Sequence, residues 1–215
     1  MPKALLLLVM EYLYTDFVRI PQELKYDLLV VSQKLCIKRL VQMCEGGRVM
    51  PSTYSDDLVK TLNNPKRYPG DIILIVEDKE IHAHRVVLTA SEYFRAMFLG
   101  GMIETSQKTI VIPDTSYSSF LVYLDALYGN GRILKGRISP DNALEVFIVA
   151  NRYMFNALQV GCEDIVRSAL DVGNVCQILE MTMNMSPTLQ TKCKQFIFNN
   201  YKKCSQTVGF KSMDP

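Results

Sequence analysis

The sequence predicts an α+β fold, in which a small three-stranded sheet is capped by a cluster of helices and further helices lie at both ends. Two runs rich in β-branched residues indicate strands, residues 71–76 and residues 109–113, the second ended by a proline. A further short strand is expected to begin at Ile81. The charged segment 77–80 joins the first two strands as a turn exposed to water. Elsewhere apolar residues recur at helical spacing, which predicts a mostly helical remainder.

The first strand and the helices after it are the most regular part of this pattern. Asp71 to Val76 is a nearly continuous β-branched run, as expected of a strand buried on both faces. Two helices follow, since apolar side chains then recur at helical spacing, at Val87, Leu88, Phe94, Met97 and Phe98.

Helix signals continue to the end of the chain. Asp114 or Ser116 can cap a helix that runs to Tyr128. Ser139-Pro140-Asp141 starts another, with proline in the first turn. Two further amphipathic helices are expected over residues 175–183 and 188–201.

Composition excludes several classes of function. The 215 residues carry a net charge of +2, so the chain has no excess of cations for a phosphate backbone, and we expect no nucleic-acid binding. Six cysteines without a C-x-x-C pair predict reduced thiols in a cytoplasmic or nuclear protein. The apolar run 4–10 is too short to span a bilayer and has no cleavage site after it, which favours a buried helix.

The chain contains a weak internal repeat. Leu13-Tyr14-Thr15 matches Leu127-Tyr128-Gly129 at an offset of 114 residues, and Cys44-Glu45 matches Cys162-Glu163 at an offset of 118. A glycine-bearing loop over residues 129–136 accounts for the difference. Spacing of this size indicates a tandem duplication. The alternative is an unrelated helical hairpin whose matches are accidental.

The order of strand, tight return, second strand and two helices resembles the opening of a BTB/POZ domain, and the resemblance continues over the next seventy or so residues. It implies a complete domain at residues 70–168. Residues 1–45 then resemble the last three helices of a truncated first copy, and residues 46–69 form a linker in which Leu58, Val59 and Leu62 can make a short docking helix. Residues 169–201 resemble the opening helices of a BACK domain, and residues 202–215 are expected to be a disordered tail.

No constellation for catalysis or cofactor binding is recognised, and we expect no enzyme, cofactor or metal. His82 and His84 share one side of a strand, but aliphatic residues and Arg85 surround them instead of further ligands. The resemblance implies that His84 sits at a strand-to-helix corner and bonds backbone there. No cysteine has an orienting neighbour, and no nucleophile elbow or phosphate loop is present.

The resemblance implies a surface for a partner. Met102-x-Glu104 matches the hydrophobic-x-Glu pattern of cullin-binding BTB domains, in which an apolar anchor enters a pocket beside a carboxylate that meets a donor. Phe98, Met102 and Glu104 would then face the N-terminal region of cullin-3. An exposed methionine in a solvated loop is the alternative. Asp71 holds a position near the family's dimer interface, and capping a turn is an equally fair interpretation.

The predicted function is therefore a non-catalytic scaffold, namely a substrate adaptor that recruits a cullin-3 RING ubiquitin ligase and can form a homodimer. Its substrate would be read by regions outside these residues, and the resemblance leaves open whether these are kelch repeats, ankyrin repeats or a GTPase-like domain. The rival is a BTB module that only dimerises or holds a transcriptional corepressor, a class that usually lacks the hydrophobic-x-Glu element. A channel-tetramerisation relative is disfavoured, because no membrane span is seen.

Overall fold

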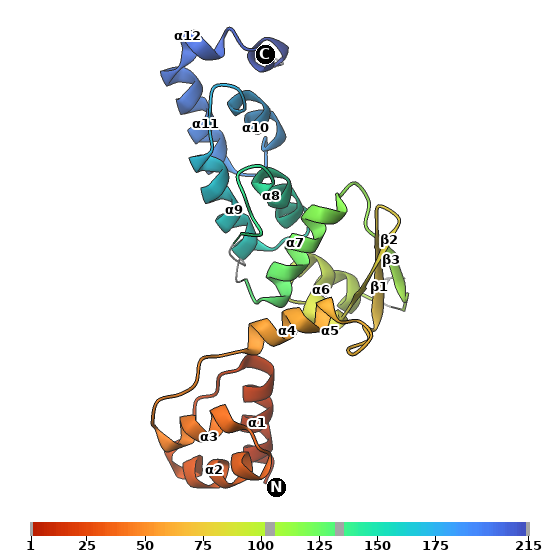
Figure 1. Cartoon of the computed structure of the whole chain (residues 1–215), viewed down its shortest axis with the longest axis vertical. Helices are drawn as coiled ribbons and strands as arrows, with labels where there is room; N and C mark the ends of the chain where they lie inside the picture. Colours follow the sequence, from red (N-terminus) through yellow and green to blue (C-terminus); the bar gives the residue numbers. More distant parts are fainter. Residues whose placement is uncertain (1, 102–105, 132–135, 214–215) are drawn as a thin grey trace. The chain divides into compact units, whose positions relative to one another are not determined.

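A computed structural model describes residues 2–101, 106–131 and 136–213 of the chain. The chain is mixed α+β, with one three-stranded sheet and many helices, as the sequence predicts (Figure 1). It divides into two compact units, Met1–Asp57 and Leu58–Pro215. No helix of the described residues is long and apolar enough to cross a membrane.

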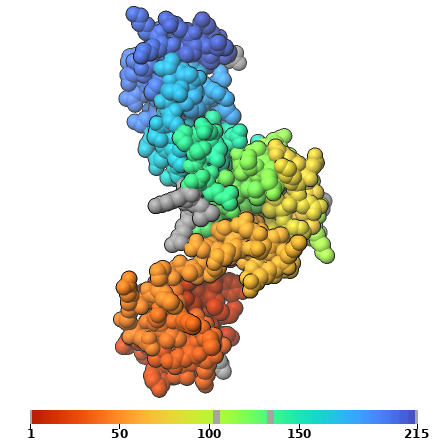
Figure 2. All heavy atoms as spheres, in the orientation of Figure 1, coloured from red at the N-terminus to blue at the C-terminus, as the bar shows by residue number. Residues whose placement is uncertain are grey.

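The first unit is helical. It comprises α1 (Lys3–Thr15), the 3-10 turn η1 (Gln22–Leu24), α2 (Lys25–Lys34) and α3 (Lys38–Glu45), coloured red to orange in Figures 1 and 2. These helices bury a small core of their own, made by Leu5, Val9, Tyr12, Val18, Leu28, Leu40 and Cys44. Leu5, Val9, Leu28 and Leu40 are thus buried by the helices of this unit against one another.

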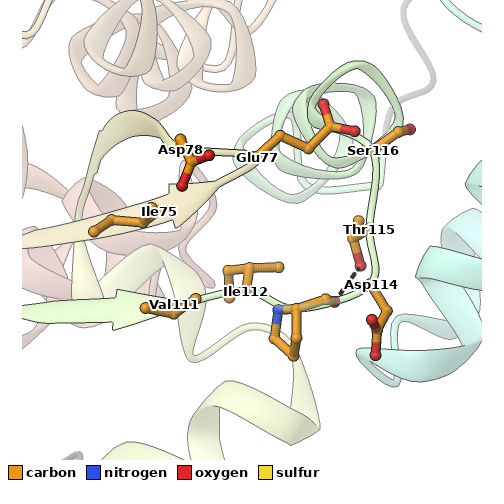
Figure 3. Close-up of a pocket in the computed structure, with 9 residues that line it drawn as sticks. Ile75, Glu77, Asp78, Val111, Ile112, Asp114, Thr115 and Ser116 are labelled. Atoms are coloured by element: carbon orange, nitrogen blue, oxygen red, sulfur yellow. Dashed lines mark hydrogen bonds between the residues drawn. The ribbon is translucent and has the colours of Figure 1, made fainter.

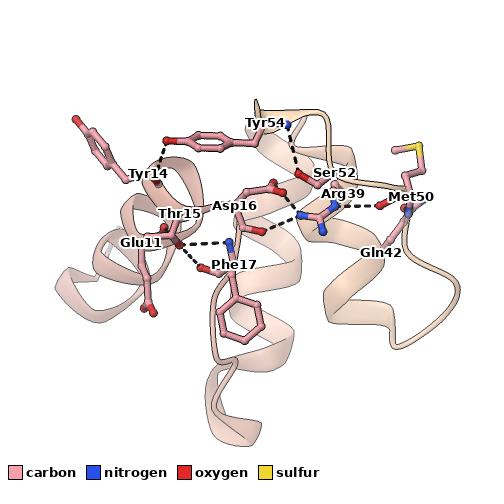
Figure 4. Close-up of polar contacts among 10 residues, drawn as sticks. All are labelled: Glu11, Tyr14, Thr15, Asp16, Phe17, Arg39, Gln42, Met50, Ser52 and Tyr54. Atoms are coloured by element: carbon pink, nitrogen blue, oxygen red, sulfur yellow. Dashed lines mark hydrogen bonds and ion pairs between the residues drawn. The ribbon is translucent and has the colours of Figure 1, made fainter. Parts of the chain in front are cut away.

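Polar contacts connect the end of α1 with α3 and with the segment that follows α3 (Figure 4). One terminal nitrogen of the Arg39 guanidinium lies 2.7 Å from an Asp16 carboxylate oxygen and 2.8 Å from the Asp16 carbonyl oxygen. Nε of Arg39 donates to the Met50 carbonyl at 3.0 Å, and the Tyr54 hydroxyl donates to the Tyr14 carbonyl at 2.7 Å. Arg39 thus joins the end of α1 to the segment that follows α3.

The sheet belongs to the second unit and has the order β2-β1-β3. β1 (Ile72–Val76) pairs with β2 (Lys79–Ala83) antiparallel and with β3 (Thr109–Val111) parallel. Glu77 and Asp78 form the two-residue turn between β1 and β2, with φ of 48° and 61°. Positive φ at both positions matches the right-handed twist of the strands, as in type I′ hairpins.

Burial of β1 differs from the expectation of two buried faces. Ile72, Leu74 and Val76 are fully buried, whereas Ile73 and Ile75 are only partly buried. The β-branched run therefore reports strand propensity and one core-facing side, and it does not require a second covering layer.

Helices α5 (Arg85–Leu88), α6 (Glu92–Leu99), α7 (Tyr117–Tyr128), α8 (Ala143–Arg152) and α9 (Asn156–Ser168) complete the main core. Ser91 and Ser116 cap α6 and α7 by accepting from the third following backbone N–H, so Ser116 and not Asp114 is the cap of α7. Aromatic rings fill the centre, where Tyr153 stacks on Phe94 with centroids 5.7 Å apart.

A helix also forms in the stretch expected to be a linker. α4 (Tyr54–Asn63) has two aspartates in its first turn, which favours a helix start. Leu62 is buried in the main core of the second unit, and Leu58 and Val59 pack against that core. These are the three side chains from which a short docking helix is predicted.

The C-terminal helices have a second core. α10 (Val175–Met181) and α11 (Pro187–Asn199) match the predicted pair, and α12 (Tyr201–Cys204) and α13 (Val208–Ser212) follow. Cys204 is fully buried and Phe210 packs against the same cluster. The expectation of a disordered tail is thus wrong for residues 202–213, because Cys204, Phe210 and Met213 anchor a segment whose composition is largely polar.

Candidate functional site

The predicted partner surface begins at the end of α6. Ser91 caps the helix, and the last two residues, Phe98 and Leu99, point to different environments. Phe98 is 6% exposed and belongs to the main core, whereas Leu99 is 75% exposed. Ile110 in β3 is buried, so the chain between α6 and β3 is held at both ends by core residues.

Phe98 is held from two sides. Its ring stacks on Phe94 with centroids 5.9 Å apart, and the Arg85 guanidinium lies 4.8 Å from its centroid. Arg85 also donates to the Gln107 carbonyl oxygen, and so contacts the chain just ahead of β3. Phe98 therefore supports this surface from within, and Leu99 is the exposed apolar side chain next to it.

Met102 and Glu104, the two residues of the predicted anchor and carboxylate, lie outside the described residues. Their place in the chain is nevertheless defined, because they fall between α6 and β3. This is the position that the resemblance assigns to a cullin-binding element.

Asp71 acts as a cap in the described structure. It is exposed, and its Oδ1 accepts from the backbone N–H of Arg85 at 2.8 Å, at the first residue of α5. A carboxylate at this end satisfies a free donor and is favoured by the helix dipole. The capping interpretation is therefore sufficient for Asp71, and its place near a dimer interface stays a prediction.

His84 lies at the predicted strand-to-helix corner, between β2 and α5. Its backbone N–H donates to the Tyr128 hydroxyl at 2.8 Å, and its Nδ1 lies 3.0 Å from the same oxygen. The imidazole thus contacts a tyrosine and not backbone, which corrects the expected partner. Burial raises the pKa of Tyr128, so this hydroxyl stays protonated.

An open hollow of about 510 Å³ lies beside the ends of β1 and β3 (Figure 3). Its acidic side chains are Glu77, Asp78 and Asp114. Oε2 of Glu77 accepts from the backbone N–H of Tyr117 at 3.0 Å, so this carboxylate helps to start α7. Among the described residues no group of three or more His, Cys, Asp or Glu could hold a metal ion.

The six cysteines are free thiols, five of them buried and only Cys36 exposed. Burial raises the pKa of Cys162 to about 12 and that of Cys193 to about 11. Thiols of such high pKa are poor nucleophiles at neutral pH, which fits a role as small apolar side chains.

Sequence reasoning missed three residues of this region: Arg85, Leu99 and Tyr128. Leu99 ends a helical run, and an apolar residue at a helix end gave no sign of exposure. The link between Tyr128 and His84 joins positions 44 residues apart, which only the fold brings together. The sequence shows Arg85 as a charge next to the histidines, but it does not predict the contact of Arg85 with Phe98.

Comparison with known proteins places these observations in a family. The BTB/POZ domain family matches residues 61–170. The chain is 38% identical to BTB/POZ domain-containing protein 9 of Drosophila melanogaster over 128 residues, and 31% identical to the human protein of that name over 147 residues. It is 30% identical to Kelch-like protein 22 of Xenopus tropicalis over 145 residues.

These alignments cover 59%, 67% and 66% of this chain, but only 17%, 24% and 22% of the three relatives. The chain thus spans less than a quarter of the length of these relatives. The matched segment contains the whole sheet, the corner at His84 and the chain between α6 and β3. Because the family matches more than half of its residues, the chain belongs to the BTB/POZ domain family.

Proposed function

We propose that this chain is an adaptor that recruits a cullin-3 RING ubiquitin ligase through the segment between α6 and β3. The observation that carries the proposal is the exposure of Leu99, three residues ahead of Met102 in the Met102-x-Glu104 pattern and beside a buried Phe98. A largely exposed leucine beside a buried aromatic support is a suitable apolar anchor for a partner helix. Membership of the BTB/POZ family, which supplies protein-interaction modules, supports it.

The proposed complex uses two kinds of contact. Leu99 and Met102 supply apolar area, and Glu104 supplies a charge that fixes the register of the partner. Phe98 is not a contact residue in this proposal. Its place under Arg85 instead orients the end of α6, so its replacement acts through the fold.

A binding assay with a purified cullin-3 N-terminal fragment tests the proposal. The double variant Met102→Glu/Glu104→Lys and the single variant Leu99→Glu are expected to weaken capture at least about tenfold, as for the loss of a central anchor. The matched control is Val160→Glu, because Val160 is 63% exposed on α9 and lies outside the proposed surface. Circular dichroism establishes that all three remain folded.

The results separate the two candidate functions. Equal capture by the folded double variant and the wild type would rule out this surface. Absence of capture by the wild type would rule out the adaptor assignment and favour the dimerisation or corepressor class. In this proposal the delivered protein is recognised by a region other than the BTB/POZ domain.

A further inference from the structure

The helices of the first unit repeat the geometry of α7–α9. α2 and α8 each span ten residues, at an offset of 118. After each helix one residue turns into the left-handed region, Cys36 with φ of 58° and Met154 with φ of 50°. This is the offset at which Cys44-Glu45 matches Cys162-Glu163 in the sequence.

The hydrogen bonds at these helix ends repeat as well. The N–H of Ile37 donates to the Ser32 carbonyl at 2.9 Å, and the N–H of Phe155 donates to the Ala150 carbonyl at 2.9 Å. Both pairs are again related by 118 residues. Non-glycine residues with positive φ are uncommon, so two of them at equivalent positions with equivalent bonds are independent support for one structural unit used twice.

The two copies of this unit, α1–α3 and α7–α9, differ in which side chains they bury. Some equivalent positions are buried in both copies, namely the pair Leu28 and Val146 and the pair Leu40 and Leu158. At other equivalent positions the side chain is exposed in the first copy and buried in the second. Leu13 is 50% exposed and its equivalent Leu127 is 2% exposed; Tyr14 is 62% exposed and Tyr128 is buried completely.

Three further pairs follow the same rule. Leu6, Met10 and Leu35 are exposed, and their equivalents Phe120, Leu124 and Tyr153 are buried. We call Leu6, Met10, Leu13, Tyr14 and Leu35 the uncovered face. None of them is charged, and on the second copy the equivalent side chains lie in the main core together with the sheet and helices α5 and α6.

The second copy shows what covers such a face. Tyr153 packs edge-on against Tyr93 of α6 at 5.0 Å between centroids, and the Tyr128 hydroxyl accepts from the N–H of His84 at the start of α5. The sheet, α5 and α6, which lie within residues 70–113, thus form a half-domain that covers the equivalent face of α7–α9. Tyr14 keeps the tyrosine of that contact, and Leu13 keeps the leucine beside it.

We propose that the uncovered face, formed by α1 and by Leu35 at the end of α2, is a docking surface for a half-domain of the kind that lies within residues 70–113. The partner presents an uncharged sheet-and-helix surface and, at its strand-to-helix corner, a backbone N–H that meets the Tyr14 hydroxyl. The proposed occupant is such a half-domain in covalent connection with the N-terminal end of α1, in the way that Ser116 leads directly into α7. This proposal is independent of cullin binding, because it concerns the first unit only.

A fused chain tests the proposal. A copy of residues 64–116 is joined directly to Lys3 of the full chain, so that α1 follows it with the spacing of α7. Oxidation of Met10 by hydrogen peroxide then reports cover of the face, and trypsin releases Met10 as the only methionine of residues 4–19. Met50, exposed and the only methionine of residues 49–60, is the internal reference.

We expect Met10 to oxidise as fast as Met50 in the unfused chain and at least about tenfold more slowly in the fused chain. Leu6→Glu/Leu13→Glu should abolish this protection, whereas Tyr26→Ser, at an exposed position outside the face, should retain it. In the fused chain alone, Tyr14→Phe should lower the melting temperature by a few degrees, as expected for a lost hydrogen bond.

Three results would overturn the proposal. Met10 that stays as reactive as Met50 in the fused chain means that the half-domain does not seat there. Slow oxidation in the dilute, unfused chain means that the chain covers the face itself. Protection of Met10 that grows with protein concentration, together with a dimer mass in light scattering, means that the occupant is another molecule of this chain.

Discussion

A Cβ atom placed on Gly70 would lie 2.7 Å from the backbone nitrogen of Ala83 and closer still to its carbonyl oxygen. The backbone just before β1 thus passes the end of β2 so closely that only glycine fits. The obstruction is backbone of a paired strand and not the end of a flexible side chain, so relief requires movement of the sheet.

Gly70→Ala is therefore expected to reduce the free energy of unfolding by about 1–3 kcal/mol, the range of overpacked sites. Urea unfolding followed by circular dichroism measures it. Gly47→Ala is the control, because a Cβ at Gly47 meets no atom within 4 Å. An equal unfolding midpoint for the two variants would contradict the account of this contact.

The Tyr128 hydroxyl is the second tested contact. Tyr128→Phe removes the acceptor of the His84 N–H without changing the ring, so a donor at the corner between β2 and α5 loses its partner. We expect a loss of about 1–3 kcal/mol, the cost of an unsatisfied partly buried group. Tyr201→Phe, at an exposed tyrosine, should change stability by less than about 0.5 kcal/mol. Urea unfolding measures both variants, and equal unfolding midpoints would mean that water replaces the Tyr128 hydroxyl at no cost in stability.

The fold of the second unit could be predicted from local signals. Each strand has its own apolar run with a defined end, and serines precede α6 and α7 at the capping distance. These signals lie within a few residues of the structure that they determine. The sequence does not predict the short helices α12 and α13, because Cys204, Phe210 and Met213 are spaced among polar residues without a helical period.

The candidate site could be predicted only as a segment. The pattern at residues 102–104 fixes its place between α6 and β3, but the exposure of Leu99 and the burial of Phe98 depend on how α6 rests on Arg85 and Phe94. Two adjacent apolar residues at a helix end look alike in sequence. Which of them faces the core is set by the crossing of the helix over its neighbours, which is a tertiary property.

Arg39 is expected to stabilise the first unit. Its guanidinium bonds Asp16 and the Met50 carbonyl oxygen at once, and its side chain is only 24% exposed. Arg39→Lys can keep one charge contact but has no second planar donor for Met50, so we expect a loss of about 1–2 kcal/mol. Arg48→Lys is the control, at an exposed arginine nearby in the chain. Hydrogen exchange of α1 amides measures the change in this unit separately, and equal exchange in both variants would contradict it.

Thiol labelling should report the burial of the cysteines. At pH 8 one thiol per chain, Cys36, is expected to react quickly with a disulfide reagent, because it is the exposed one. Burial raises the pKa of Cys162 to about 12, so its thiolate is scarce at this pH as well as inaccessible. Cys36→Ser should remove the fast reaction, and urea should release five thiols. A second fast thiol in the folded Cys36→Ser variant would show that a buried cysteine is accessible.

Asp125 should make stability depend on pH. It is 4% exposed on α7 and pairs with Arg137 at 2.9 Å; burial raises its carboxyl pKa, and Arg137 opposes this by lowering it. A raised pKa means that the folded state holds the proton more tightly than the unfolded state. Stability from this group is therefore present at low pH and is lost as the pH rises through the folded-state pKa.

Asp125→Asn removes that loss and keeps an oxygen for Arg137. The urea midpoint of the variant relative to the wild type should therefore rise between pH 4 and pH 7. Arg137→Gln provides the matched test, since without the cation the carboxyl pKa rises further and the decline of stability with pH should become steeper than in the wild type. A difference between Asp125→Asn and the wild type that stays constant over this range would show that the ion pair balances the burial of the carboxylate.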